Sequence, residues 1–159
     1  MNALARGCGS VLVLVLTLIS GLAVDALAQD AKLRTYNRNP VVISSQIHLA
    51  REQEQRAMEL IAAGAEDPAT LEKTKAIVYD AYVLIRVAIG GVRMAQGAKF
   101  PDPLLPIQID LMEKARAELR QCMADLDRAR FGQVKRLENA RAWLESSMAN
   151  LNSLVLLLP

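Results

Sequence analysis

Apolar residues recur three and four positions apart through most of the chain beyond residue 40, which is the spacing of one buried face of an α-helix. The pattern falls into four segments, at about 40–63, 68–97, 103–131 and 133–157. No segment shows the strict alternation of a β-strand. The sequence therefore predicts an all-α fold.

Proline and glycine separate the four segments. Three segments begin with a side chain that can cap a helix, followed by proline at the first helical position, where its missing N–H costs nothing. Glycine at the joints fits the left-handed conformation of a helix end. These residues are Asn39-Pro40, Asp67-Pro68, Asp102-Pro103, Gly64 and Gly132. Because short connections make neighbouring helices run in opposite directions, we predict an antiparallel up-down four-helix bundle over residues 40–159.

Each segment carries a stripe that we expect to form the core. The stripe residues are Ile43, Ile47, Ala50, Ala57 and Ile61; Leu71, Val78, Ala81, Tyr82, Ile85, Ala88, Ile89 and Val92; Met112, Ala115, Leu119, Cys122, Leu126 and Ala129; and Val134, Leu137, Leu144, Met148, Leu151 and Val155, with Ala140 and Trp143 broadening the last stripe. Gly90-Gly91 lies within the second stripe. Three interpretations of this pair stay open: a kink, a close helix contact or an early helix end. The apolar tail Leu154–Leu158 is expected to cap the end of the bundle.

Two charged residues lie on these stripes. Glu54 falls between Ala50 and Ala57, and Arg141 falls between Leu137 and Leu144. A buried carboxylate must be paired, protonated or turned towards another subunit, because burying an unpaired charge costs several kcal/mol. We predict a Glu54–Arg141 pair between the first and last helices, with rotation of both residues to the boundary as the alternative.

The first 28 residues have the pattern of a secretory signal peptide. Arg6 precedes an apolar run, and Ala26-Leu27-Ala28 supplies the small residues of a cleavage site. The run is shorter than the ~20 apolar residues of a spanning helix. We expect cleavage after Ala28, a flexible lead-in over residues 29–39, and a periplasmic or secreted protein without stable membrane insertion.

Charge and cysteine content narrow the class of protein. Loss of Arg6 and Asp25 with the leader leaves the net charge at +2, which argues against a dedicated binder of nucleic acid. Loss of Cys8 leaves Cys122 alone, so an internal disulfide is excluded. A basic group near the third joint could hold an anion or could be a solvated helix end. It consists of Arg128, Arg130, Lys135 and Arg136.

Candidate chemistry is sparse. Cys122 has neither the second cysteine nor the adjacent histidine that c-type haem attachment requires. A b-type haem could be held by His48 and a methionine, with Met58, Met94, Met112 and Met148 as candidates. His48 is the single histidine of the chain, so a dimetal site or a hydrolytic triad lacks its ligands. We expect a non-enzymatic protein without a cofactor or metal.

The run from Ile47 to Met58, IHLAREQEQRAM, resembles the opening helix of the periplasmic sensor bundle of type IV pilus chemotaxis transducers and nitrate/nitrite sensor kinases. That family has the pattern I-N-x-A-G-x-x-R-M-x-S-x-R. Ile47 and Ala50 match it, whereas Arg51 replaces a glycine and Glu54 replaces the arginine that binds the anion in nitrate sensors. The resemblance implies the fold and a sensing role, and no binding residue is carried over.

These observations predict an exported sensory domain that binds a small ligand or another protein, with a homodimer possible. Candidate binding residues are Arg51, Glu54, Arg56 and Arg141. The alternative is a structural or assembly protein with chaperone-like binding, and haem carriage is a minor alternative. A ligand site predicts a polar pocket between helices, whereas an assembly factor predicts exposed apolar surface.

Overall fold

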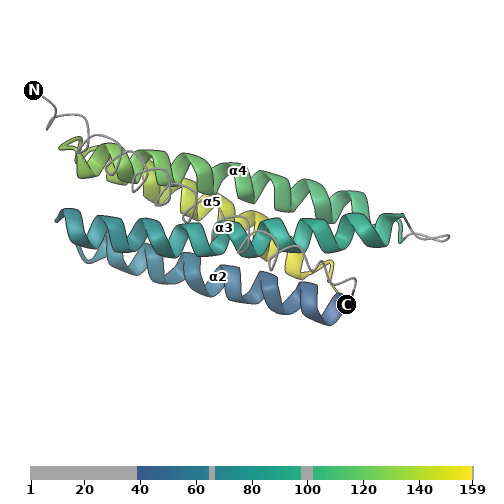
Figure 1. The fold of residues 1–159 in the computed structure, drawn as a ribbon. Coiled ribbons are helices and arrows are strands. Elements are labelled where there is room, and N and C mark those ends of the chain that lie inside the picture. The colour runs from purple at the N-terminus through teal and green to yellow at the C-terminus, as the bar shows by residue number, and fades with distance from the viewer. Residues whose placement is uncertain (1–38, 65–66, 98–101, 159) are drawn as a thin grey trace, which may run out of the picture. The chain divides into compact units, whose positions relative to one another are not determined.

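Four helices form the part of the chain that the structure, a computed structural model, describes: residues 39–64, 67–97 and 102–158. They are α2 (Pro40–Ala62), α3 (Pro68–Gln96), α4 (Leu105–Arg130) and α5 (Arg136–Val155). Each helix packs against the next, and α2 and α5 close the ring (Figure 1). The predicted all-α four-helix bundle is confirmed. The predicted leader and cleavage site lie outside the described residues.

Two helix starts have the predicted caps. The Asn39 side chain accepts a hydrogen bond from the Val41 N–H at 3.0 Å. Asp67 accepts one from the Thr70 N–H at 2.9 Å. Each bond satisfies a backbone donor that has no partner within its own helix. Hydrogen bonding by the Thr70 side chain, and secondly by the Thr70 N–H, lowers the pKa of the Asp67 carboxyl.

The remaining joints between helices agree only in part with the sequence prediction. Gly64 and Gly132 adopt positive φ angles of 72° and 95°, as expected at helix ends. The predicted start at residue 103 is wrong, because α4 begins at Leu105. Asp102 instead closes a turn before the helix, in which its side chain accepts the Leu104 N–H at 2.8 Å.

Gly90 and Gly91 do not end α3, which continues to Gln96. Gly91 is buried. The early helix end is therefore excluded for this segment.

The core follows the predicted stripes closely in α2, α3 and α4. Ile61 and Tyr82 are only partly buried, and the free thiol of Cys122 is fully buried, as predicted. None of the described helices has the length and hydropathy needed to cross a membrane.

The stripe predicted for α5 is wrong in part. The residues that α5 buries are Ala140, Leu144, Ser147, Leu151 and Leu154. Val134 is exposed because it precedes α5 in a turn, and Trp143 is also exposed. Leu137, Met148 and Val155 lie at the boundary. The helix is thus rotated towards Ser147, which changes the neighbour of Glu54.

Candidate functional site

The contact between α2 and α5, here called the α2–α5 seam, is the least extensively packed of the four helix contacts. It carries an open pocket of about 510 Å³. The pocket is lined by His48, Arg51, Glu52, Gln55, Arg56 and Glu59 of α2 and by Met148 of α5. Positions three and four apart share a helix face, so α2 presents a polar stripe beside its apolar one.

Glu54 is fully buried beside this polar stripe. Its Oε1 accepts a hydrogen bond from Ser147 Oγ at 3.0 Å, across the seam. Ser147 Oγ also lies 3.4 Å from the Ala115 carbonyl oxygen of α4. The Oε2 atom of Glu54 is buried without a hydrogen-bond partner among the described residues.

Burial raises the pKa of Glu54 to about 8. The Ser147 hydrogen bond and the Arg51 charge oppose this shift, whereas the Glu118 charge adds to it. A carboxyl with this pKa is mostly protonated at neutral pH. Of the three states considered for Glu54, protonation is the one that its surroundings favour.

The predicted Glu54–Arg141 pair is not formed. Arg141 is 56% exposed, and its Nε donates to Glu145 Oε1 at 2.8 Å within α5. The rotation of α5 places Ser147 opposite Glu54. Ser147 is therefore a site residue that the sequence reasoning missed, because a serine within an amphipathic helix carries no signal that it will be buried.

The structure brings two of the four candidate residues to one pocket. Arg51 and Arg56 both line it, Glu54 lies buried next to it, and Arg141 is absent from its lining. The Nε atom of Arg51 is buried and, within the described part of the chain, has no hydrogen-bond partner. Arg51 Nε and Glu54 Oε2 are thus two unsatisfied polar atoms on residues three positions apart in α2.

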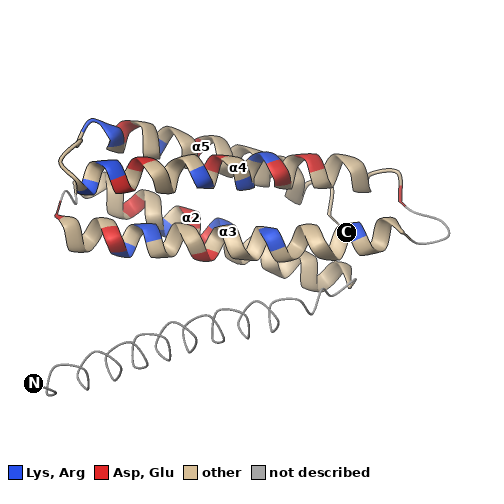
Figure 2. Cartoon of the chain, turned by 45° about the horizontal axis from the view of Figure 1, so that its top comes forward, with Lys and Arg blue, Asp and Glu red and all other residues tan. Residues whose placement is uncertain are grey.

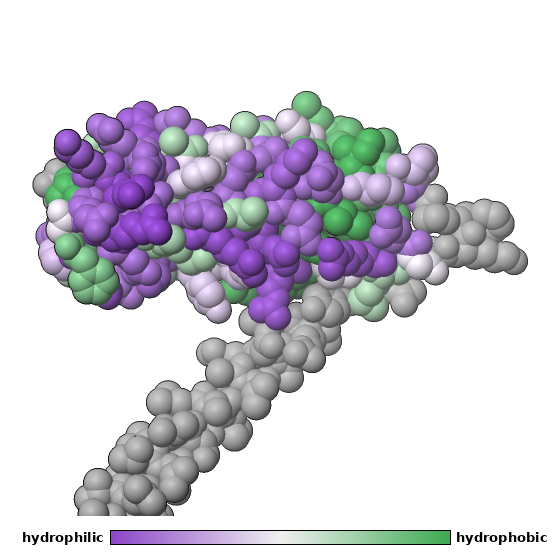
Figure 3. Space-filling view, turned by 90° about the horizontal axis from the view of Figure 1, so that it is seen from above, coloured by the Kyte–Doolittle hydropathy of each residue, from purple (hydrophilic) through white to green (hydrophobic). Residues whose placement is uncertain are grey.

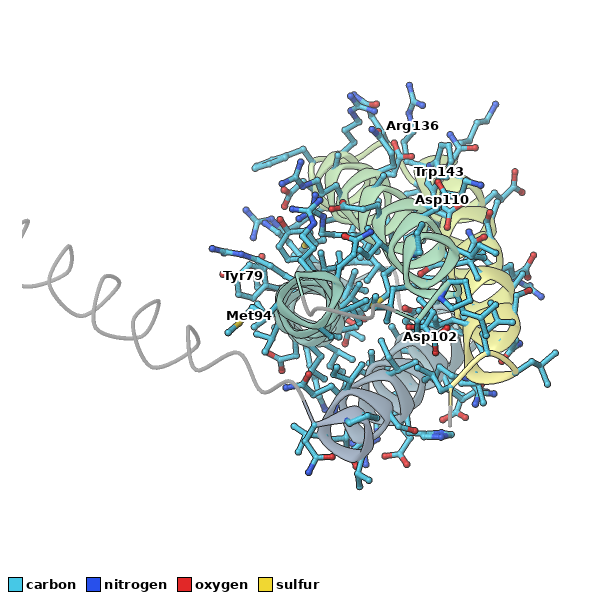
Figure 4. All side chains as sticks on the ribbon, turned by 90° about the vertical axis from the view of Figure 1, so that its right-hand side faces the viewer. Tyr79, Met94, Asp102, Asp110, Arg136 and Trp143 are labelled. Atoms are coloured by element: carbon cyan, nitrogen blue, oxygen red, sulfur yellow. The ribbon has the colours of Figure 1, made fainter. Side chains whose placement is uncertain are left out.

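The basic group at the α4–α5 joint is largely paired internally. Buried Asp125 accepts from Arg128 Nη1 at 3.0 Å and from Trp143 Nε1 at 3.1 Å, and Arg136 Nη1 lies 3.8 Å from it. Figure 4 shows Arg136 and Trp143 on the α4–α5 side of the bundle. Arg130 forms an ion pair with Glu72 of α3. These arginines form ion pairs with carboxylates of the chain itself. This pairing weakens the hypothesis of an anion site at the α4–α5 joint.

The pocket also contains a methionine and the histidine considered for haem. His48 and Met148 both line it, whereas Met112 is buried in the core. Charged side chains make up most of the lining, and a porphyrin requires apolar surfaces against its faces. The residues therefore do not fit a haem. Among the described residues, no group of three or more histidine, cysteine, aspartate or glutamate side chains could hold a metal ion.

Comparison of the chain with protein-family models, with curated proteins and with solved structures finds no match. The functional argument therefore depends on the geometry of the seam.

Proposed function

We propose that this chain is an exported, non-enzymatic helical bundle that binds a small polar ligand at the α2–α5 seam and serves as a sensory domain in the periplasm or outside the cell. The observation that carries the proposal is the pair of unsatisfied buried atoms, Arg51 Nε and Glu54 Oε2, beside an open pocket. A buried polar atom without a partner costs about 1–3 kcal/mol. Of these two residues Arg51 lines the pocket, so a ligand that engages its guanidinium would recover part of that cost.

The charges of the pocket indicate the class of ligand. Arg51 and Arg56 supply guanidinium groups, which bind carboxylate or phosphate through paired hydrogen bonds. Glu52 and Glu59 supply acceptors for an ammonium group. Because both signs are present, a zwitterion such as a free amino acid fits the lining better than a simple anion. The resemblance to sensor bundles supports the theme of sensing.

A thermal-shift screen of residues 29–159 against amino acids, dicarboxylates, phosphate and nitrate tests the proposal. We expect an amino acid to raise the melting temperature, since a ligand at one hundred times its Kd stabilises the folded state by about 2.7 kcal/mol. Arg51→Gln should abolish the shift. The matched control, Arg141→Gln, should preserve it because Arg141 is not part of the pocket lining. No shift across the panel, or equal loss in both variants, would contradict a ligand site at the seam.

The second candidate is a structural or assembly protein that binds another protein. It requires exposed apolar surface, and apolar side chains are exposed at the end of the bundle where α2 begins. A flat ligand screen together with recovery of a defined protein complex or a stable homodimer would favour this candidate over the sensory domain.

A further inference from the structure

The charged residues of α2 lie in the part of the helix that forms the pocket. Residues 40–50 contain no aspartate, glutamate, lysine or arginine, and Figure 2 shows the first turns of α2 without charged residues. The next turns carry Arg51, Glu52, Glu54, Arg56 and Glu59. All of these except Glu54 line the pocket. Glu54 therefore belongs to the core side of the same charged segment.

Glu54 has none of the solvent that surrounds charges at the surface. In Figure 3 hydrophilic residues cover most of the face in view, where water can solvate them. Glu54 is fully buried, and its Oε2 has no hydrogen-bond partner among the described residues. Its Oε1 accepts from Ser147 Oγ of α5 at 3.0 Å. An ionised carboxylate in this position needs a counter-charge, because burying an unpaired charge costs several kcal/mol.

The helices packed around Glu54 differ in what they offer to it. Glu118 of α4 opposes ionisation of Glu54 through its negative charge, and the charge of Glu54 acts in turn on the buried Cys122 thiol of the same helix. The residues that α3 buries carry no charge, and their one hydroxyl, on Thr74, bonds within α3. Arg51 of α2 is thus the cation, within the described part of the chain, whose charge favours ionised Glu54.

Arg51 connects Glu54 to the pocket. It lines the pocket, and its Nε is buried without a hydrogen-bond partner among the residues that the structure describes. Residues three positions apart are neighbours on the surface of a helix. A ligand carboxylate that binds the Arg51 guanidinium brings a negative charge to the cation that favours ionised Glu54. The ligand and ionised Glu54 therefore compete for the same positive charge.

We propose that a carboxylate ligand in the seam pocket and a proton on Glu54 bind cooperatively, so that ligand binding draws a proton from solvent onto Glu54. The inference rests on the proposed ligand site. The carboxylate of the ligand stays ionised, and water or buffer supplies the proton. Because coupling between two sites is reciprocal, the proton raises the affinity for the ligand by the same factor as the ligand raises the affinity for the proton. The bundle thus responds to the ligand and to pH together.

Calorimetric titration of residues 29–159 with L-glutamate tests this coupling, after circular dichroism has established that the fragment is helical. L-Glutamate offers carboxylates to Arg51 and Arg56 and an ammonium group to Glu52 or Glu59. We expect the affinity to fall about threefold or more between pH 6.5 and pH 9, because coupling between two sites is typically fivefold or larger and burial raises the pKa of Glu54 to about 8. At pH 8, titrations in buffers of different ionisation enthalpy should show net proton uptake.

Glu54→Gln isolates the contribution of Glu54. It keeps a carbonyl acceptor for Ser147 and every titratable group of the pocket lining, but it cannot ionise at this position. We expect this variant to show a much flatter pH profile, tighter binding than the parent at pH 9, and loss of the proton uptake at pH 8. The matched control is Glu138→Gln, at an exposed position of α5 outside the pocket lining, which should keep the profile of the parent.

Two results would overturn the proposal, and they differ in what they mean for the pocket. The first is binding of L-glutamate with the same pH profile and the same proton uptake in the parent and in Glu54→Gln, which would remove the coupling and leave the ligand site in place. The second is no binding by either protein at any pH, which would contradict the ligand site and the coupling together.

Discussion

Glu54 is a carboxyl group inside an apolar core, held at Oε1 by Ser147 and unpartnered at Oε2. Burial raises its pKa from 4.5 to about 8. Between these values the folded state binds more protons than the unfolded state, so the free energy of unfolding falls as pH rises. The loss is up to ~1.4 kcal/mol per pH unit. The stabilising effect of protonated Glu54 is complete only below about pH 4.5 and is gone above about pH 8.

We therefore predict that urea denaturation at pH 6, 7, 8 and 9 gives a falling free energy of unfolding for the parent protein and a much flatter profile for Glu54→Gln. Glutamine keeps the carbonyl acceptor for Ser147 but cannot ionise. Glu52→Gln, at an exposed position on the same helix, is the control and should retain the parent slope. Equal slopes in the parent and Glu54→Gln would mean that Glu54 does not titrate in this range.

Cys122 is a second residue whose burial has a measurable consequence. Its side chain is fully buried, and burial together with the charges of Glu54 and Asp125 raises the pKa of the thiol. A buried thiol with a raised pKa reacts slowly, because the thiolate is the nucleophile. We predict that residues 29–159, which lack Cys8, show no labelling by a thiol reagent in the native state at pH 8 and complete labelling in denaturant.

An introduced cysteine at exposed Ser153 provides the control for reagent activity. In Ser153→Cys/Cys122→Ala the single thiol should react at once under native conditions. Rapid native labelling of Cys122, or a Cys122-linked dimer on a non-reducing gel, would place this thiol at a surface and contradict its position in the core.

At the scale of the helices, the α2–α5 seam packs less extensively than the other three contacts. α2 is also the first helix of the bundle and therefore has one covalent connection to the other three. Local opening is favoured where few buried contacts are lost. We predict that hydrogen exchange of central α2 amides, measured by mass spectrometry, is faster than exchange in the centres of α3 and α4. Slower exchange in α2 than in both of these helices would contradict a weak seam.

Ser147 connects the seam to the chemistry of Glu54. Replacing it with alanine removes the hydrogen bond to Oε1 and should destabilise the fold by about 1 kcal/mol. Because that bond lowers the pKa of Glu54, its loss should also extend the fall in stability to higher pH. Denaturation of Ser147→Ala and of Ser153→Ala, an exposed matched control, tests both effects. Identical profiles for the two variants would mean that the Ser147 bond contributes nothing.

The sequence predicts helices better than it predicts which face each helix buries. Asn39, Asp67, Gly64 and Gly132 mark ends through local chain geometry, which acts within a few residues and can be recognised without tertiary context. The orientation of α5 depends on packing against two other helices, and Ser147 gains its buried position only because Glu54 and Ala115 face it. The Glu54–Arg141 prediction failed for this reason.

The pocket was only partly predictable for a similar reason. Arg51 and Arg56 were among the candidates predicted from the sequence, and both line the pocket. The pocket itself depends on the spacing between α2 and α5 and on Met148, which the sequence pattern assigned to the core. Spacing between helices is a result of side-chain volumes across the whole bundle, and a single sequence stripe does not specify it.

At the scale of the whole molecule, the buried residues of all four helices form one core between Ile43 and Leu154. Residues 29–159 should therefore fold without the leader in a single cooperative transition. Trp143, which donates to Asp125 between α4 and α5, reports tertiary structure by fluorescence, while circular dichroism reports all four helices.

We predict that the two urea transitions coincide, and that Leu119→Ala lowers the free energy of unfolding by about 2–5 kcal/mol in both signals. Leu156→Ala, at an exposed position, is the control and should change it by less than ~0.5 kcal/mol. A fluorescence transition at clearly higher urea than the dichroism transition would show instead that α4 and α5 remain folded after α2 has separated.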